Sequence, residues 1–538
     1  WSLEVMVGLC DDPINQAQMP LKIDFNENGH IALCGMVVSG KSTFVQTLLY
    51  SLINRYAPDA VSIYALDYSS RMLAPFEGLA HCGGVIFEDE IEKTSKFFTM
   101  ISKELDRRKL LFRGGNYAQY VRANGLVEPA VVVVIDGYAN FREKTDNKYE
   151  DILISLSRDG SNYGIFLVLT ANGFGSMDIQ SRIGDNIKSV MCLEMGDKYK
   201  YADALKVTHL DIMPESNIKG RGMTIVNGSV LEFQTAVCIS AEDDYERAEK
   251  MRARFDEMNA AWKGKHAKQI PQIPDNPTWE ILSRADEYRE LLQDDRSLPL
   301  GYHSANASLF SIDLSKTFTY LIGGKAHTGK TNVISCLMKA SKDKGGKQFV
   351  IDSAGDLQTL SIEHGADYIR TDEEIAVFAK DLFDEMLKRN AYKKEIKARV
   401  VTDEELFLEM SKFPPYYIFI DDLSDFLSRL YSSEPKMIEI VGFIENFLDK
   451  GSYHNMFVVA ALSLKNYGLV LNRRSFELIS SRKNGLLLGG KVTDQRLFDM
   501  SGMPYQEQSK TYKPGIGLVP ASENIALPQK IVIPLARG

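Results

Sequence analysis

The feature that most constrains this chain is a glycine-rich motif that occurs twice. GMVVSGKS begins at Gly35 and GKAHTGKT begins at Gly324, and both satisfy the pattern G-x-x-x-x-G-K-[ST]. Each copy follows an apolar, strand-like segment and precedes a segment with apolar residues at helical spacing. Loops of this kind hold phosphate groups on their backbone amides at the start of a helix. The pattern therefore predicts two nucleotide sites.

The two motifs belong to a longer internal repeat. Other landmarks recur in the same order and at nearly the same separation, which favours two homologous domains in tandem over a short-period repeat. The pairs, with their separations in residues, are Lys41 and Lys330 (289), Asp136 and Asp421 (285), Gly160 and Gly451 (291), and Gly220 and Gly515 (295).

A proline-rich stretch marks the predicted boundary between the copies. The helical pattern that ends in AAWKGKHAK gives way to QIPQIPDNP, and proline cannot continue a helix. We expect one domain over residues 1–264 and a second over residues 265–538, each long enough to bury its own core.

The fold class follows from the alternation of strands and helices within each copy. VVVVID and GIFLVLT in the first copy, with YYIFID and MFVVAAL in the second, are too apolar to leave one face in water. Such strands are typical of parallel sheets that are covered by helices on both faces. We expect an α/β fold with two tandem P-loop NTPase domains of the RecA type, each a mostly parallel sheet flanked by helices.

Composition excludes several other classes of protein. The formal net charge of −9 over 538 residues argues against non-specific nucleic-acid binding. Apolar runs such as 130–135 are far shorter than the roughly 20 residues of a membrane span. The six cysteines lie far apart and form no zinc-ligand or disulfide pattern. Because the chain begins with Trp1, we expect a fragment of a longer protein, with any membrane segment outside it.

The motifs predict which residues would hold ATP and Mg²⁺. The two lysines would reach the β- and γ-phosphates, and the hydroxyls of Ser42 and Thr331 would ligate Mg²⁺. Asp136 and Asp421 end apolar strands about 90 residues after these lysines and suit the Walker B carboxylate. The candidate nucleotide-binding residues are Gly35, Ser39, Gly40, Lys41, Ser42 and Thr43 in the first copy, and Gly324, Thr328, Gly329, Lys330, Thr331 and Asn332 in the second.

The residue after each Walker B aspartate bears on hydrolysis. A hydrolytic P-loop enzyme usually carries a glutamate there, which orients the attacking water. The first copy has Gly137, which cannot act as a base, and the second has Asp422, which is one methylene shorter than glutamate. Because small displacements cost large factors in rate, we expect binding at both sites, no hydrolysis at the first and weak hydrolysis at the second. Asp422 is the one candidate catalytic residue.

Arginines form a second group of candidates. Arg107 and Arg108 could sense phosphate or bridge subunits, although a solvated helix face stabilised by neighbouring carboxylates is the commoner role. Arg158, before a glycine turn, could act as an arginine finger.

These landmarks resemble the FtsK/SpoIIIE family of ring-forming P-loop motors. The segments that carry the resemblance, besides the two P-loops, are ALDYSSRMLAPFEGLAHCGGVIFEDE, ELDRRKLLF and SRDGSNYGIFLVLTAN. Asn172 stands at the family's glutamine, and Leu462 is expected at the same place in the second copy.

The tandem arrangement, with degenerate catalytic residues, is similar to the C-terminal ATPase region of the EssC/EccC family of type VII secretion motors. QIPQIPDNPTWEIL resembles that family's interdomain connection. The resemblance implies regulatory domains that bind ATP at the cytoplasmic face of the cell membrane. It also implies as partners small helical-hairpin substrates with a C-terminal signal and other parts of the motor, with membrane contact only through segments outside this chain.

Two alternatives stay open at this point. A DNA translocase of the same superfamily would carry intact catalytic glutamates and a basic channel, and nucleic acid is therefore not an expected partner. A scaffold that no longer binds nucleotide would have no reason to keep both lysines and both hydroxyl ligands.

Overall fold

The computed structural model describes every residue except 1, 211–212, 400–401, 523–524 and 538. The chain divides into two compact units, Trp1–Gln272 and Ile273–Gly538. The segment before this division belongs to the first unit, because the Ala267 amide donates to the carbonyl of Ala80 at 2.8 Å and the Ile270 amide to that of Gly83 at 2.9 Å.

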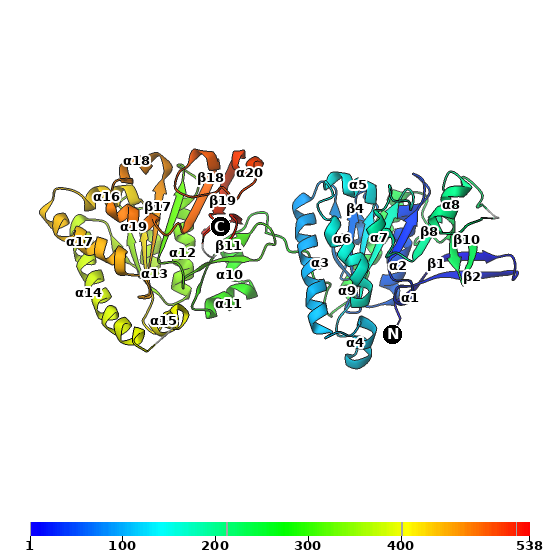
Figure 1. Cartoon of the computed structure of the whole chain (residues 1–538), viewed down its shortest axis with the longest axis horizontal. Helices are drawn as coiled ribbons and strands as arrows, with labels where there is room; N and C mark the ends of the chain where they lie inside the picture. Colours follow the sequence, from blue (N-terminus) through cyan, green and yellow to red (C-terminus); the bar gives the residue numbers. More distant parts are fainter. Residues whose placement is uncertain (1, 211–212, 400–401, 523–524, 538) are drawn as a thin grey trace. The chain divides into compact units, whose positions relative to one another are not determined.

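A ten-stranded sheet forms the centre of the first unit (Figure 1). Its six parallel strands run in the order β8-β3-β7-β6-β4-β5, and the antiparallel strands β9, β10, β1 and β2 extend the β8 edge. The strands are β1 (Glu4–Asp12), β2 (Ala17–Asp24), β3 (Ile31–Cys34), β4 (Val61–Asp67), β5 (Cys82–Phe87), β6 (Ala130–Asp136), β7 (Ile165–Ala171), β8 (Ser189–Leu193), β9 (Arg221–Val226) and β10 (Ser229–Thr235).

Helices cover both faces of this sheet. Side chains alternate between the faces of a strand, so Val132 and Val134 of β6 join the core under α2 and α9, whereas Val131 and Val133 join the core under α3 and α6. This is why the strand has no polar residue before Asp136. The helices are α1 (Phe25–Asn28), α2 (Lys41–Arg55), α3 (Ile91–Leu111), α4 (Tyr117–Asn124), α5 (Tyr138–Lys144), α6 (Glu150–Asp159), α7 (Ser181–Gly184), α8 (Lys198–Ala204) and α9 (Asp244–Ala261).

The second unit repeats this sheet strand for strand. Its order, β12-β11-β20-β19-β18-β13-β17-β16-β14-β15, is the same arrangement as in the first unit. The strands are β11 (Ser297–His303), β12 (Leu309–Asp313), β13 (Thr319–Gly324), β14 (Lys347–Ile351), β15 (Asp367–Ile369), β16 (Tyr416–Ile420), β17 (Met456–Ser463), β18 (Gly485–Gly490), β19 (Tyr512–Val519) and β20 (Gln529–Val532).

Helices again lie on both faces of the sheet. The central P-loop helix α12 packs on one face and the long helix α14 on the other. The helices are α10 (Trp279–Ser283), α11 (Asp286–Gln293), α12 (Lys330–Asp343), α13 (Gln358–His364), α14 (Asp372–Lys397), α15 (Asp403–Met410), α16 (Leu423–Leu430), α17 (Pro435–Lys450), α18 (Tyr467–Val470), α19 (Arg474–Ser480) and α20 (Tyr505–Ser509). The two sheets confirm the predicted fold class.

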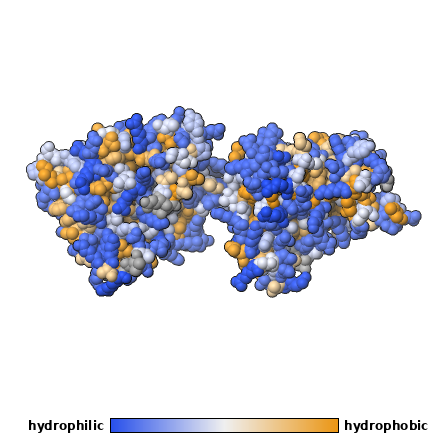
Figure 2. Space-filling view, in the orientation of Figure 1, coloured by the Kyte–Doolittle hydropathy of each residue, from blue (hydrophilic) through white to orange (hydrophobic). Residues whose placement is uncertain are grey.

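The surface of each unit is dominated by hydrophilic side chains on the face that Figure 2 shows, with apolar side chains scattered among them. Among the described residues, no helix combines the length and the apolar character that a membrane crossing requires.

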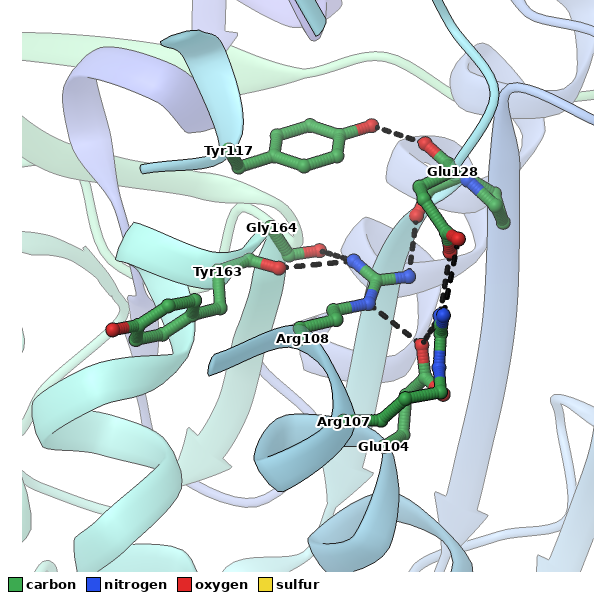
Figure 3. A network of polar contacts seen from close by, with 8 residues as sticks. Glu104, Arg107, Arg108, Tyr117, Glu128, Tyr163 and Gly164 are labelled. Atoms are coloured by element: carbon green, nitrogen blue, oxygen red, sulfur yellow. Dashed lines mark hydrogen bonds and ion pairs between the residues drawn. The ribbon is translucent and has the colours of Figure 1, made fainter. Parts of the chain in front are cut away.

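A buried arginine anchors the long helix of each unit. In α3 the Arg108 side chain is 1% exposed; it donates to Glu104 at 2.7 Å and to the carbonyls of Pro129 at 2.8 Å and Tyr163 at 2.9 Å (Figure 3). Those carbonyls precede β6 and β7, so one side chain joins the helix to the N-terminal ends of two central strands. The guanidinium thereby satisfies backbone groups that burial would otherwise leave unpaired.

The same anchor occurs in the second unit. Arg389 of α14 is fully buried, donates to Glu385 at 2.9 Å and reaches the carbonyls of Pro414 and His454 at 3.0 and 2.9 Å. For Arg108, both the solvated face and the phosphate-sensing role that the sequence suggested are wrong, because the side chain is buried at the sheet end opposite the P-loops. Arg107 is the solvated member of the pair and binds Glu104 and Glu128.

Candidate nucleotide-binding sites

The first P-loop lies between β3 and α2 at the carboxyl end of the central strand. Gly40 has φ +104°, a left-handed conformation that favours glycine, and α2 begins at the next residue. The Lys41 Nζ donates to the carbonyls of Gly35 at 2.6 Å and Met36 at 2.9 Å, and approaches Asn172 Oδ1 at 3.4 Å. Burial lowers the pKa of Lys41, and the charge of Asp136 opposes this shift.

Asp136 faces this loop and has both carboxylate oxygens bonded. Ser42 Oγ donates to Oδ2 at 2.7 Å, and Thr170 Oγ1 donates to Oδ1 at 2.6 Å. The same threonine oxygen accepts from the Gly137 amide at 2.8 Å. Burial raises the pKa of Asp136, while the two hydroxyl donors oppose the shift. The structure thus brings together the hydroxyl, carboxylate and lysine that the sequence predicted.

A cavity of 820 Å³ opens over this group. A nucleoside triphosphate fits its size, and the donor set suits phosphate and Mg²⁺, because lysine and loop amides meet anions whereas hydroxyl and carboxylate oxygens suit a hard cation. The lining includes Gly40, Lys41, Ser42, Thr43, Tyr68, Asn140, Thr170, Asn172, Lys219, Gly220, Gln234, Val237 and Arg247. Gly35 and Ser39 shape the loop beneath it, and Ser39 Oγ is buried without a hydrogen-bond partner.

Gly137 occupies a backbone position that excludes a side chain. Its φ is +87°, and a Cβ there would lie 2.8 Å from the carbonyl oxygen of Tyr68. The backbone at this position therefore disfavours a glutamate. Any larger residue would need the segment at Tyr68 to move.

The second P-loop has the same backbone but different contacts. Gly329 has φ +99°, and Lys330 Nζ donates to the carbonyl of Lys325 at 2.8 Å. Lys325, where the first unit has Met36, forms an ion pair with Asp494 at 2.6 Å. Thr328 Oγ1 donates to the same Lys325 carbonyl at 2.9 Å.

Asn332 contacts the C-terminal segment of the chain. Its Nδ2 donates to the carbonyl of Pro534 at 2.9 Å, and its Oδ1 accepts from the Ala536 amide at 2.8 Å. The side-chain amide of this predicted nucleotide-binding residue is therefore already engaged at both ends.

The second Walker B carboxylate is only half satisfied. Thr331 Oγ1 donates to Asp421 Oδ2 at 3.2 Å, but Asp421 Oδ1 is buried without a hydrogen-bond partner. Strand register explains the difference: Ile135 pairs with Leu169 and Ile420 with Ala460, so the next residues are Thr170 in the first unit and Ala461 in the second. Burial, with nearby carboxylates, raises the pKa of Asp421 to about 6. An orphaned carboxylate oxygen beside a hydroxyl fits a cation or its bound water.

Asp422 caps a helix. Its Oδ1 accepts from the Ser424 amide at 2.9 Å, the Ser424 hydroxyl at 2.5 Å and the Asp425 amide at 3.2 Å, at the start of α16. N-cap bonds of this kind stabilise helices by about 1 kcal/mol. This oxygen is therefore committed to the helix, and a catalytic role for Asp422 stays a prediction.

One sequence correspondence is wrong by a single residue. In the sheets, Cys34 pairs with Ala171, whereas Gly323 pairs with Leu462 and Gly324 with Ser463. Asn172 therefore corresponds to Ser463 instead of Leu462, and the Ser463 hydroxyl is buried without a hydrogen-bond partner. Arg158, the candidate arginine finger, is exposed and pairs with the adjacent Asp159.

Sequence reasoning missed several residues that line the cavity. Gln234 lies in β10, Val237 follows that strand and Arg247 lies in the first turn of α9, and no motif distinguishes these residues. Gly220 did give a signal as a landmark of the repeat. Its amide donates to the carbonyl of Ser39 at 2.9 Å, which brings β9 against the P-loop.

A family model described as the FtsK/SpoIIIE family matches residues 5–258. The first unit is an FtsK/SpoIIIE domain. The second unit repeats the strand order of this FtsK/SpoIIIE domain and its P-loop position.

Curated relatives extend the likeness over nearly the whole chain. The type VII secretion system protein EssC of Staphylococcus aureus (strain MRSA252) is 24% identical over 521 residues, 95% of this chain and 33% of the relative. The ESX secretion system protein YukB of Bacillus subtilis (strain 168) is 25% identical over 533 residues, 98% of this chain and 34% of the relative. The chain thus spans about a third of the length of these relatives.

Solved structures show the same tandem fold. ATPases 2 and 3 of EssC from Geobacillus thermodenitrificans give a TM-score of 0.76 at 21% identity, covering 99% of this chain and 96% of that one. ATPases 2 and 3 of EccC from Thermomonospora curvata, in complex with a signal sequence peptide, give 0.63 at 21% identity, covering 100% and 93%. The FtsK/SpoIIIE domain and its repeat therefore have the fold of tandem ATPase domains.

Proposed function

We propose that both P-loops bind ATP with Mg²⁺. In the first unit, Lys41 and the loop amides hold the phosphates, while Ser42 and Asp136 hold the cation; Lys330, Thr331 and Asp421 do the same in the second unit. Bound Mg²⁺ would neutralise phosphate charge and fix the orientation of the triphosphate. The observation that supports this best is the 820 Å³ cavity over Lys41, Ser42 and Thr43, with the Asp136 carboxylate 2.7 Å from the Ser42 hydroxyl.

Hydrolysis at these sites is absent or weak. In the first unit no carboxylate follows Asp136, and the backbone of Gly137 leaves no room for one. In the second unit the Asp422 oxygen that caps α16 already accepts three hydrogen bonds, so a role as base would compete with the cap. The sites therefore serve to hold each domain in a defined, nucleotide-dependent state.

The chain acts as the tandem ATPase-type region of an EssC-like type VII secretion motor. Relatives named EssC and YukB match across at least 95% of its length, and its fold is that of ATPases 2 and 3 of EssC. Its role is regulation and substrate recognition. The partners are small helical-hairpin proteins with a C-terminal signal and other parts of the motor, and the complex works at the cytoplasmic face of the membrane through segments outside this chain.

Calorimetric titration of Mg·ATP, with turnover followed in the same sample, tests this proposal. We expect two binding events in the chain, one in Lys41→Ala and one in Lys330→Ala, with turnover at background in all three. The absence of binding would contradict the nucleotide sites. Robust turnover would contradict the regulatory role and require a base supplied by another residue.

A further inference from the structure

Two cations of the second unit meet at one serine, at the sheet end opposite the P-loop. Lys393 Nζ, on α14, donates to the main-chain carbonyl of Ser452 at 2.6 Å. Arg482, in the turn after α19, donates through Nη2 to the Ser452 hydroxyl. Aromatic rings back both cations: Tyr453 lies 5.8 Å from Lys393 and Phe318 lies 5.4 Å from Arg482. Three separate elements therefore converge on this point.

Neither cation has a carboxylate partner among the described residues. Asp403, an acid in the same region, accepts from the Tyr453 hydroxyl at 3.2 Å and forms an ion pair with neither cation. Lys393 is half-buried, and burial together with the charges of Lys397 and Arg482 lowers its pKa to about 8. A partly desolvated ammonium among like charges is an unfavourable arrangement unless an anion completes it.

The first unit provides an internal comparison. Because Arg108 and Arg389 are equivalent, Lys393 corresponds to Phe112, which stacks on Tyr120 at 4.5 Å. Arg482 corresponds to Ile187, which is 1% exposed. The fold therefore does not require a cation at either position, and of the two units only the second carries them.

Neutralisation of a helix end does not account for this pair. Lysines in the last turn of α14, Lys394 and Lys397, suit the helix dipole. Lys393 precedes that turn, and Arg482 comes from another element. A cavity of 30 Å³ lies beside Arg482 and Ser452; its lining includes polar groups of Lys316 and Thr317 and apolar side chains such as Phe318. It has room for one or two oxygen atoms.

We propose that Lys393 and Arg482, joined through Ser452, form a binding site for a phosphate group, separate from the nucleotide sites. A phosphate carries close to two negative charges at neutral pH and matches two unpaired cations. Arginine offers planar paired donors and lysine a mobile point charge, which together suit phosphate oxygens. Terminal oxygens enter the small cavity, and the remainder of the ligand lies outside it.

Phosphate titration of the full chain tests this site. The background variant is Lys41→Ala/Lys330→Ala, because phosphate would otherwise also bind the P-loops. Calorimetry with inorganic phosphate at constant ionic strength, set with chloride, should show one binding event. Lys393→Met and Arg482→Gln should each weaken it at least tenfold. The neighbouring Lys394→Met is the matched control and should leave the affinity unchanged.

Each outcome decides the proposal. No binding beyond the chloride baseline, or full affinity in Arg482→Gln, would overturn it; this exposed residue can be replaced without disturbing the core. An equal effect of Lys394→Met would also overturn it, because binding would then depend on the overall positive charge of the region and not on these two residues. Glycerol phosphate distinguishes the source: equal affinity supports an organic phosphate monoester as ligand, whereas binding of inorganic phosphate alone supports the free anion.

Discussion

Thr170 should contribute more to the stability of the first unit than the size of its side chain suggests. Its hydroxyl donates to Asp136 at 2.6 Å and accepts from the Gly137 amide at 2.8 Å, and the residue is fully buried. Thr170→Val keeps the shape but leaves a carboxylate oxygen and an amide unpaired. A hydrogen bond to a charged group is worth about 2 kcal/mol, and an orphaned buried amide costs about 1 kcal/mol more. We expect a loss of about 3 kcal/mol.

Thr170→Ser is the matched control. It keeps the hydroxyl and removes one methyl group, which costs about 1 kcal/mol. Urea unfolding of the full chain measures both losses, and hydrogen exchange at the Gly137 amide reports the site directly. Protection of that amide should fall about 100-fold in Thr170→Val, since each 1.4 kcal/mol is a factor of ten. Equal losses for valine and serine, or unchanged exchange at Gly137, would refute the reasoning.

Three further perturbations test other parts of the structure. Gly137→Ala should destabilise by about 2 kcal/mol more than Gly78→Ala in urea unfolding, because both sites have positive φ but only the first would clash; equal losses would contradict this. Arg108→Met should cost about 4 kcal/mol, since it leaves the carbonyls of Pro129 and Tyr163 without this donor and removes one of the two cations that bind the partly buried Glu104; comparable loss in the exposed Arg107→Met would refute the anchor. Finally, burial raises the pKa of Asp421 from its usual 3.8 to about 6. The folded state thus binds this proton more tightly, so stability falls as pH rises from about 4 to about 6; Asp421→Asn should flatten that slope in urea unfolding measured across pH, and an unchanged slope would refute the assignment.

Local patterns predicted the P-loops and the apolar strands beside them, because glycine conformations and apolar runs are encoded in neighbouring residues. The burial of Arg108 was not predictable in this way, since its partners Pro129 and Tyr163 lie 21 and 55 residues away. Leu462 was placed one residue out of register, because an apolar strand carries no polar residue to fix the alignment. Once the strand register is known, Thr170 and Ala461 are seen to occupy equivalent positions, and the sequence shows that only the first has a hydroxyl.

Arg108 and Arg389 lie at equivalent places in the two sheets, at the ends opposite the P-loops. At the carboxyl ends of the strands the copies have drifted apart, as Thr170 and Ala461 or Met36 and Lys325 illustrate. At the opposite ends Arg108 and Arg389 keep the same set of partners. Because no residue of this anchor contacts the P-loop, the anchor can hold the sheet together whichever residues stand at the nucleotide site. Substitutions at the nucleotide site of either unit can therefore change what that unit binds while its fold is kept.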